Sequence, residues 1–185
     1  SAMSTSFITV NNDSTHGFNS IPLMMGPTQD GFNNVLIADG QSIPVVPGHY
    51  TALYVTNTQV NGPRTKMLVL NYADSATTHS LRWGDWCAPS QAAPDFFTWA
   101  PTHRLDAGGG DGATCGLITK YVPVDPNRTL TSVTIGTDSA LNGGGITLPG
   151  DTVSGTNGRT MIGGITLAST DATLGGYGLV SGHVL

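Results

Sequence analysis

The chain has 185 residues and a formal net charge of -5 at pH 7; 25 residues are glycine, 11 are proline, only 10% are charged, and all 12 acidic residues are aspartate. Glycine and proline disfavour helix interiors by ~1 and ~3 kcal/mol, and aspartate favours turns, so this composition excludes a helical protein and predicts one all-β domain. The seven scattered basic residues form no phosphate-neutralising stripe, and no apolar run approaches the ~20 residues of a membrane span, so we expect no nucleic-acid and no membrane partner.

Short runs rich in β-branched and aromatic residues recur between glycine, proline, asparagine and aspartate, and they predict about eight strands. In chain order these are Phe7–Val10, Ile43–Val46, Tyr50–Thr56, Lys66–Tyr72, His79–Trp83, Gly116–Val124, Leu130–Ile135 and Thr160–Leu167. No helical segment separates them, whereas a parallel sheet would need crossover helices. We therefore expect an antiparallel β-sandwich of jelly-roll type.

The expected burial differs between two of these strands. Leu130–Ile135 alternates apolar and polar residues, which predicts a half-solvated strand, whereas Met67–Tyr72 is nearly continuous apolar and predicts a buried central strand. Residues 138–158 are rich in glycine, threonine, serine and asparagine, which predicts an extended loop with one edge strand. We assign residues 1–170 to the sandwich and 171–185 to an edge strand or a C-terminal linker, with no separate domain.

The two cysteines, Cys87 and Cys115, lie in segments rich in glycine, aspartate and proline. A disulfide between them would close a long loop and stabilise the fold by ~3 kcal/mol, because it restricts the unfolded chain. We expect this disulfide and, with it, a secreted, extracellular protein. The alternative is two buried free thiols; zinc is not expected, because two cysteines without paired histidines do not supply four ligands.

Segments between Asn33 and Ile135 carry a family resemblance. They include Ala38-Asp-Gly-Gln-Ser-Ile-Pro44, Tyr50-Thr-Ala-Leu-Tyr-Val55, Leu81-Arg-Trp-Gly-Asp-Trp86, Thr102-His-Arg104 and Tyr121-Val-Pro-Val-Asp-Pro-Asn-Arg-Thr-Leu-Thr-Ser-Val-Thr-Ile135. Their order resembles galactose-binding-domain-like ancillary β-sandwiches, of the carbohydrate-binding-module type, that accompany secreted microbial glycoside hydrolases. The resemblance implies an accessory role, with carbohydrate as the commonest ligand.

The chain departs from this family in the segment between its cysteines. Leu105 follows Arg104, where those domains usually have an Arg-Asn pair, and the expected Cys87–Cys115 bridge encloses an unusually glycine-rich tip. We therefore expect this segment to be specialised.

The densest aromatic segment lies between Trp83 and Trp99, where all three tryptophans and two of the five phenylalanines occur. The C–H face of a sugar ring packs on an aromatic ring, while its hydroxyl groups require charged or amide partners at the edge. The candidate ligand-binding residues are Trp99, Phe96, Phe97, Asp95, His103 and Arg104.

The alternative for these aromatic residues is packing in the core. We expect it for Trp83 and Trp86, which flank the end of a predicted strand. For Phe96, Phe97 and Trp99, which we place on a proline-bounded loop, ligand contact and plain packing both stay open.

The segment from Asp106 to Asp111 could wrap a structural calcium ion, because hard cations favour carboxylate and carbonyl oxygens on a flexible backbone. The alternative is a glycine-rich hairpin tip in which both aspartates occupy turn positions. No other cofactor is expected.

We expect no enzymatic activity of the chain itself. It contains no glutamate, no pair of aspartates in a recognisable setting for glycoside hydrolysis, and no Gly-x-Ser-x-Gly segment. The expected function is to bind carbohydrate and so direct an attached or partner secreted hydrolase to polysaccharide. The alternative is a structural interaction domain that packs against a catalytic domain or a cell-surface partner and binds no sugar.

Overall fold

The computed structural model describes residues 7–9, 15–17, 21–24, 36–38, 40–61, 63–87, 96–99, 104–106, 109–111, 115–136 and 160–169. Within these ranges the chain forms strands β1 to β13 and no helix, so the all-β class is confirmed. The same ranges accordingly contain no helix that could cross a membrane.

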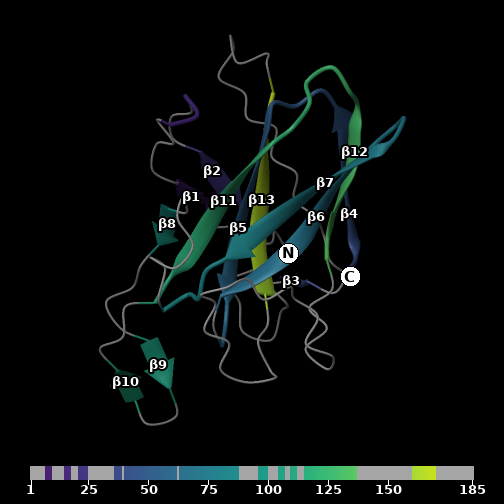
Figure 1. Ribbon diagram of the computed structural model, residues 1–185. Coiled ribbons are helices and arrows are strands. Elements are labelled where there is room, and N and C mark those ends of the chain that lie inside the picture. The colour runs from purple at the N-terminus through teal and green to yellow at the C-terminus, as the bar shows by residue number, and fades with distance from the viewer. Residues whose placement is uncertain are drawn as a thin grey trace, which may run out of the picture.

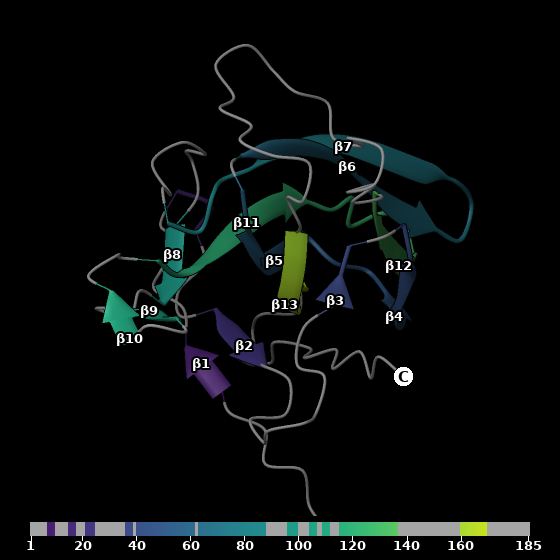
Figure 2. The ribbon, with the colours of Figure 1, turned by 90° about the horizontal axis from the view of Figure 1, so that it is seen from below.

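Two antiparallel sheets make up the body of the fold (Figures 1 and 2). The five-stranded sheet has the spatial order β3 (Leu36–Ile37), β13 (Thr160–Ala168), β5 (Ala52–Gln59), β11 (Leu117–Pro123) and β8 (Phe96–Trp99). The four-stranded sheet has the order β4 (Ser42–Gly48), β12 (Leu130–Ile135), β6 (Arg64–Tyr72) and β7 (Ala76–Trp83). Both sheets contribute buried apolar residues to one core, so the predicted β-sandwich is confirmed.

Two short hairpins lie outside these sheets. One joins β1 (Phe7–Thr9) and β2 (Pro22–Met24), and the other joins β9 (Arg104–Asp106) and β10 (Gly109–Asp111). Every predicted strand is present, with its ends shifted by a few residues at most. The strands that the sequence pattern did not predict, β2, β3, β8, β9 and β10, are short, and runs of two to four residues show no clear alternation.

Eight strands of the two sheets pair in a nested order. β3 pairs with β13, β4 with β12, β5 with β11 and β6 with β7, and successive pairs alternate between the five-stranded and the four-stranded sheet. The strands are therefore paired as in one long hairpin, which is folded so that successive pairs lie in alternate sheets. This arrangement brings segments far apart in the sequence, such as β5 and β13, side by side (Figure 1).

The core lies between the two sheets. β5 contributes Leu53 and Val55, and β6 contributes Leu68 and Leu70, all fully buried. Complete burial of an apolar side chain of this size stabilises a fold by ~1.5–3 kcal/mol. Trp83, at the end of β7, belongs to the same cluster, so its predicted place in the core is confirmed.

The prediction of a buried central strand at Met67–Tyr72 holds for its place in the sheet but is wrong for one of its faces. β6 lies between β12 and β7, and its residues Leu68 and Leu70 are buried. Met67, on the opposite face, is 38% exposed, and Val69 is half-buried. The nearly continuous apolar run concealed this difference, because Asn71 is the only polar residue that it places on the outer face of the sheet.

Residues 138–158 and 171–185 lie outside the described residues. The edge strand expected in the first range, the edge strand or linker expected in the second, and the boundary at residue 170 therefore stay predictions.

Candidate functional site

A disulfide closes the segment that carries the predicted ligand-binding residues. Cys87 and Cys115 are bonded to each other across 28 positions, as predicted. Strands β8, β9 and β10 all lie between them in the sequence. The bridge therefore joins the two ends of this long segment, which we call the disulfide-closed segment.

Backbone hydrogen bonds fix the same point. The Trp86 N–H donates to the carbonyl oxygen of Gln59 at 2.9 Å, and the Gly116 N–H donates to the carbonyl oxygen of Trp86 at 2.9 Å. The Asp85 carboxylate accepts a hydrogen bond from the Cys87 N–H at 2.8 Å. Both ends of the disulfide-closed segment therefore lie beside the end of β5.

The three aromatic residues of the predicted site lie on a strand, β8, whereas the sequence led us to expect a proline-bounded loop. Their positions along β11 are Phe96 beside Thr119, Phe97 beside Ile118 and Trp99 beside Leu117, with an irregularity in register between the last two. Aromatic residues and threonine favour strands, so a Phe-Phe-Thr-Trp sequence next to an available sheet edge adds one more strand to it.

Of the remaining predicted ligand-binding residues, only Arg104 lies in the described part of the chain. Arg104 lies on β9, where its backbone is paired with that of Asp111 on β10. Asp95 and His103 lie outside the described residues. The structure therefore brings Phe96, Phe97 and Trp99 together on one strand and places Arg104 on a hairpin of the same disulfide-closed segment.

The proposed calcium segment forms the β9–β10 hairpin at the level of the backbone. Asp106 is paired with Gly109, and Asp111 with Arg104, so the two aspartates lie on opposite strands, two positions apart along the ladder. The described part of the chain contains no group of three or more His, Cys, Asp or Glu residues that could hold a metal ion. Nothing is described of the Asp106 and Asp111 side chains, so calcium at this hairpin stays a prediction.

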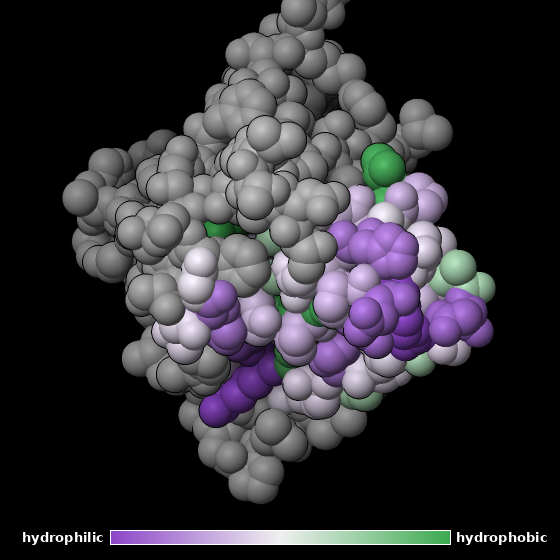
Figure 3. All heavy atoms as spheres, turned by 90° about the horizontal axis from the view of Figure 1, so that it is seen from above, coloured by the Kyte–Doolittle hydropathy of each residue, from purple (hydrophilic) through white to green (hydrophobic). Residues whose placement is uncertain are grey.

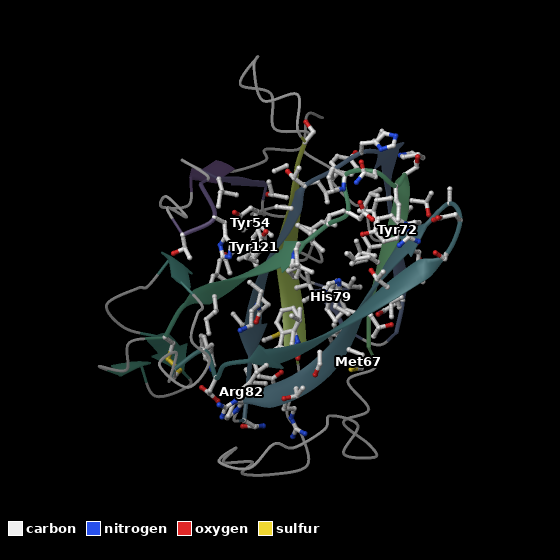
Figure 4. The ribbon with its side chains drawn as sticks, turned by 45° about the horizontal axis from the view of Figure 1, so that its top comes forward. Tyr54, Met67, Tyr72, His79, Arg82 and Tyr121 are labelled. Atoms are coloured by element: carbon white, nitrogen blue, oxygen red, sulfur yellow. A yellow bond between two sulfur atoms is a disulfide. The ribbon has the colours of Figure 1, made fainter. Side chains whose placement is uncertain are left out.

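Next to β8, the side of the five-stranded sheet that faces away from the main core is rich in tyrosine and threonine. Tyr54 and Thr56 of β5 lie opposite Tyr121 and Thr119 of β11, respectively. The two tyrosine rings meet edge to face with their centroids 5.6 Å apart (Figure 4), and the two threonine hydroxyls are hydrogen-bonded at 2.8 Å. We call these four residues the β11 face.

The N-terminal part of the chain covers one side of the β11 face. The His16 ring stacks on Tyr121, with the centroids 3.6 Å apart. Ile21 packs with Tyr54 and Ala168 in a small cluster separate from the main core. Tyr54 is consequently fully buried, whereas Tyr121 is half-buried, and β11 connects this aromatic group with β8 on its other side.

On the opposite side of the same strand, the interior contains buried cationic side chains. Lys120 alternates with Thr119 and Tyr121, so it lies on the core side of β11 with Val122. Lys66, with the same parity as the core residue Leu68, is likewise on the core side of β6. Lys66 and Lys120 are only 3% and 7% exposed. Because both side chains are buried, we assign these lysines to the interior structure. Buried charges are tolerated only when they are compensated.

The family-like segment around Asp125 forms a structural clamp between two turns. Arg128 donates to the Asp74 carboxylate from Nη2 at 2.8 Å and from Nε at 3.1 Å, and it also contacts the Ser75 hydroxyl. Its guanidinium lies 3.9 Å from the centroid of the Tyr72 ring. The Tyr72 hydroxyl accepts a hydrogen bond from the Asp125 N–H at 3.1 Å. These contacts join the β6–β7 turn to the β11–β12 connection.

The clamp also explains the electrostatic perturbations at this end of the molecule. The hydrogen bond between the two side chains lowers the pKa of Asp74 and raises the pKa of Arg128. The described surface seen from this end is largely hydrophilic (Figure 3). The Val-Asp-Pro-Asn-Arg-Thr segment is therefore held by contacts within the chain.

The sequence analysis did not single out Tyr54, Tyr121 and His16. Tyr54 and Tyr121 lie in strands that were predicted, but their contact depends on the register of β5 against β11, which the sequence alone does not specify.

Neither protein-family models nor curated proteins match this chain.

Proposed function

We propose that this chain is a non-catalytic carbohydrate-binding domain of jelly-roll topology, which directs an attached or partner secreted hydrolase to polysaccharide. The nested pairing of β3 with β13, β4 with β12, β5 with β11 and β6 with β7 supports the topology, since a jelly roll consists of eight strands in two Greek keys. Binding beside an enzyme would raise the local concentration of its substrate.

The observation that carries the proposal is the composition and position of β8. Three of its four residues are aromatic, and its backbone is paired with β11. The neighbouring strand β11 also carries the half-buried Tyr121, so aromatic residues occur on two adjacent strands. Sites on strands are held more precisely than sites on loops, and a rigid aromatic surface suits the C–H face of a sugar ring.

The disulfide supports the same assignment. It fixes the ends of the segment that contains β8 and Arg104, close to where Trp86 is hydrogen-bonded to the sandwich. Fixing a binding segment before the ligand arrives reduces the conformational entropy lost on binding. Arg104, together with Asp95 and His103, would supply the polar groups that sugar hydroxyls require.

The test is electrophoresis through gels that contain soluble polysaccharides, with Trp99→Ala and Phe96→Ala compared with wild type. Met67→Ala is the matched control, because Met67 is 38% exposed and lies on the other sheet. We expect wild type and Met67→Ala to be retarded equally. Affinity should fall about tenfold or more in Trp99→Ala, since the contact of one large apolar side chain contributes ~1.5–3 kcal/mol.

Two results would contradict this assignment. One is unchanged mobility of the wild type across a broad panel of glycans. The other is retardation of Trp99→Ala and Phe96→Ala equal to that of the wild type, which would remove β8 from the site.

A structural interaction domain is the second candidate function, and the open edge of the four-stranded sheet favours it. β7 has eight residues and is paired on one side only within the described strands. If the chain acts in this way, its removal should destabilise a catalytic domain in the same or a neighbouring chain, with no change in the binding of any sugar.

A further inference from the structure

We infer that the edge strand β7 pairs with β7 of a second copy of this chain, which joins two four-stranded sheets into one continuous sheet. This inference does not rest on carbohydrate binding. It comes from a difference between the two edges of that sheet and from the distribution of polar and charged residues along β7.

The two edges of the four-stranded sheet differ in what would block a new strand. The edge strand β4 contains Pro44 and Pro47, both exposed, and its register with β12 is interrupted between Leu130 and Ser132. Proline has no N–H to donate, and irregular pairing disturbs the ladder, so β4 is a poor template for another strand. β7 contains neither proline nor glycine and pairs with β6 without interruption from Ala76 to Trp83.

A hydrogen bond in the turn before β7 shows which backbone groups of β7 point away from β6. The Tyr72 N–H donates to the carbonyl oxygen of Ser75 at 2.8 Å, so these two residues form a hydrogen-bonded pair. Hydrogen-bonded and non-hydrogen-bonded pairs alternate along an antiparallel ladder. The backbone groups of Ala76, Thr78 and Ser80 therefore point outward along the edge.

The side chains of the same three residues do not obstruct an approaching strand. Ala76, Thr78 and Ser80 are all exposed, small or of medium size, and uncharged. β7 lies at the outer margin of its sheet in both ribbon views (Figures 1 and 2). The edge thus presents a regular row of donors and acceptors beside short side chains.

The charges at the two ends of β7 favour a second copy in the antiparallel direction. Asp74 lies in the turn before the strand, and Arg82 is near its end; Tyr72 and Arg82 mark these opposite ends in Figure 4. Antiparallel pairing with Thr78 on the two-fold axis places Arg82 of each copy beside the turn that holds Asp74 in the other. Parallel pairing in register would place the two Arg82 residues side by side, and like charges in that position are destabilising.

The Asp74 carboxylate already accepts hydrogen bonds from Arg128. A carboxylate has about four acceptor positions, so it can accept from a second arginine without releasing the first. The turn that ends the β6–β7 hairpin is therefore suited both to the clamp within one copy and to a contact with the other.

The axis at Thr78 allows a sharp test by charge exchange. In the proposed pairing, Thr78 faces its own symmetry mate, so Thr78→Lys and Thr78→Asp each bring two like charges together, whereas an equal mixture of the two variants brings opposite charges together. Sedimentation velocity of the full chain over a range of concentrations measures the state of association, and far-UV circular dichroism verifies that each variant is folded.

We expect the wild type to dimerise as its concentration rises, each single variant to weaken dimerisation at least tenfold, and the mixture to restore a heterodimer. Met67→Lys is the control, because Met67 is exposed on the neighbouring central strand β6 and should leave dimerisation unchanged. Ser80→Pro is an independent variant that should weaken the dimer, because it removes a backbone N–H that points away from β6 along the exposed edge.

The inference is overturned if the wild type stays monomeric up to about 1 mM, a concentration at which even weak specific complexes form. It is equally overturned if the wild type dimerises but Thr78→Lys, or in its place Ser80→Pro, dimerises to the same extent. Loss of dimerisation in both Thr78 variants without recovery in the mixture overturns the register about Thr78.

Discussion

Removal of the Cys87–Cys115 disulfide offers a quantitative test of how the disulfide-closed segment is held. The bridge spans 28 positions, and the loop-closure relation gives about 3.5 kcal/mol at 25 °C for a loop of this length, acting through the unfolded chain. Alanine is the suitable replacement because Cys115 is fully buried. The double variant Cys87→Ala/Cys115→Ala should therefore fold, with its free energy of unfolding reduced by about this amount.

Urea denaturation monitored by tryptophan fluorescence measures the effect. With a denaturant dependence of ~2 kcal/mol per molar urea, the midpoint should fall by about 1.8 M. Wild type reduced with phosphine should lose about the same free energy, since it lacks the same covalent link. A loss of less than about 1 kcal/mol in both samples would refute the reasoning, because it would mean that the link barely restricts the unfolded chain.

Two further predictions concern the four-stranded sheet and the turn clamp. In Gly136→Ala the new Cβ would lie 2.9 Å from the backbone oxygen of Met67, which already accepts a hydrogen bond from the Gly136 N–H, so thermal and urea denaturation should show a loss of ~1–3 kcal/mol; equal stability of variant and wild type would contradict this contact. The pKa of Asp74, measured by NMR titration, should lie below its ordinary value of 3.8 in the wild type and rise in Arg128→Ala. Because the folded carboxyl has the lower pKa, the stability it contributes is full above the unfolded pKa and is lost as the pH falls through the folded pKa; an Asp74 pKa that is the same in both proteins would exclude the clamp.

The long strands could be predicted from the sequence because each combines β-branched residues with turn residues at both ends. The run Leu130–Ile135 and the run Thr160–Leu167 correspond closely to β12 and β13. The disulfide could also be predicted, since only two cysteines are present. Such features depend on local composition, which a single sequence contains in full.

Features that depend on register or on distant pairing could not be predicted. The contact of Arg128 with Asp74 joins residues 54 positions apart, and the pattern of either segment alone does not indicate the other. The residues of β8 were placed on a proline-bounded loop, and a run of four residues is too short to show a reliable alternation. Lys66 and Lys120 are two of the seven basic residues scattered along the sequence, which gives no sign of their burial, whereas alternation with the core residues of β6 and β11 buries both.

The candidate site was predicted in part. The aromatic residues Phe96, Phe97 and Trp99 were identified by their density in the sequence, and the structure adds that they share a strand paired with β11. Tyr121 adds one aromatic residue on that neighbouring strand, and it meets the fully buried Tyr54 of β5 edge to face. This contact follows from the fold, since the two tyrosines are distant in the sequence and meet only through the pairing of β5 with β11.

The most direct test of carbohydrate binding at β8 is an amide-resolved NMR titration of the chain with an oligosaccharide from the polysaccharide that retards it most. The account predicts that the largest chemical-shift changes occur at Phe96–Trp99 and at the neighbouring residues of β11, Leu117 to Tyr121. Changes concentrated instead at the turn clamp around Asp74 and Arg128, or no change with any oligosaccharide of the panel, would contradict it.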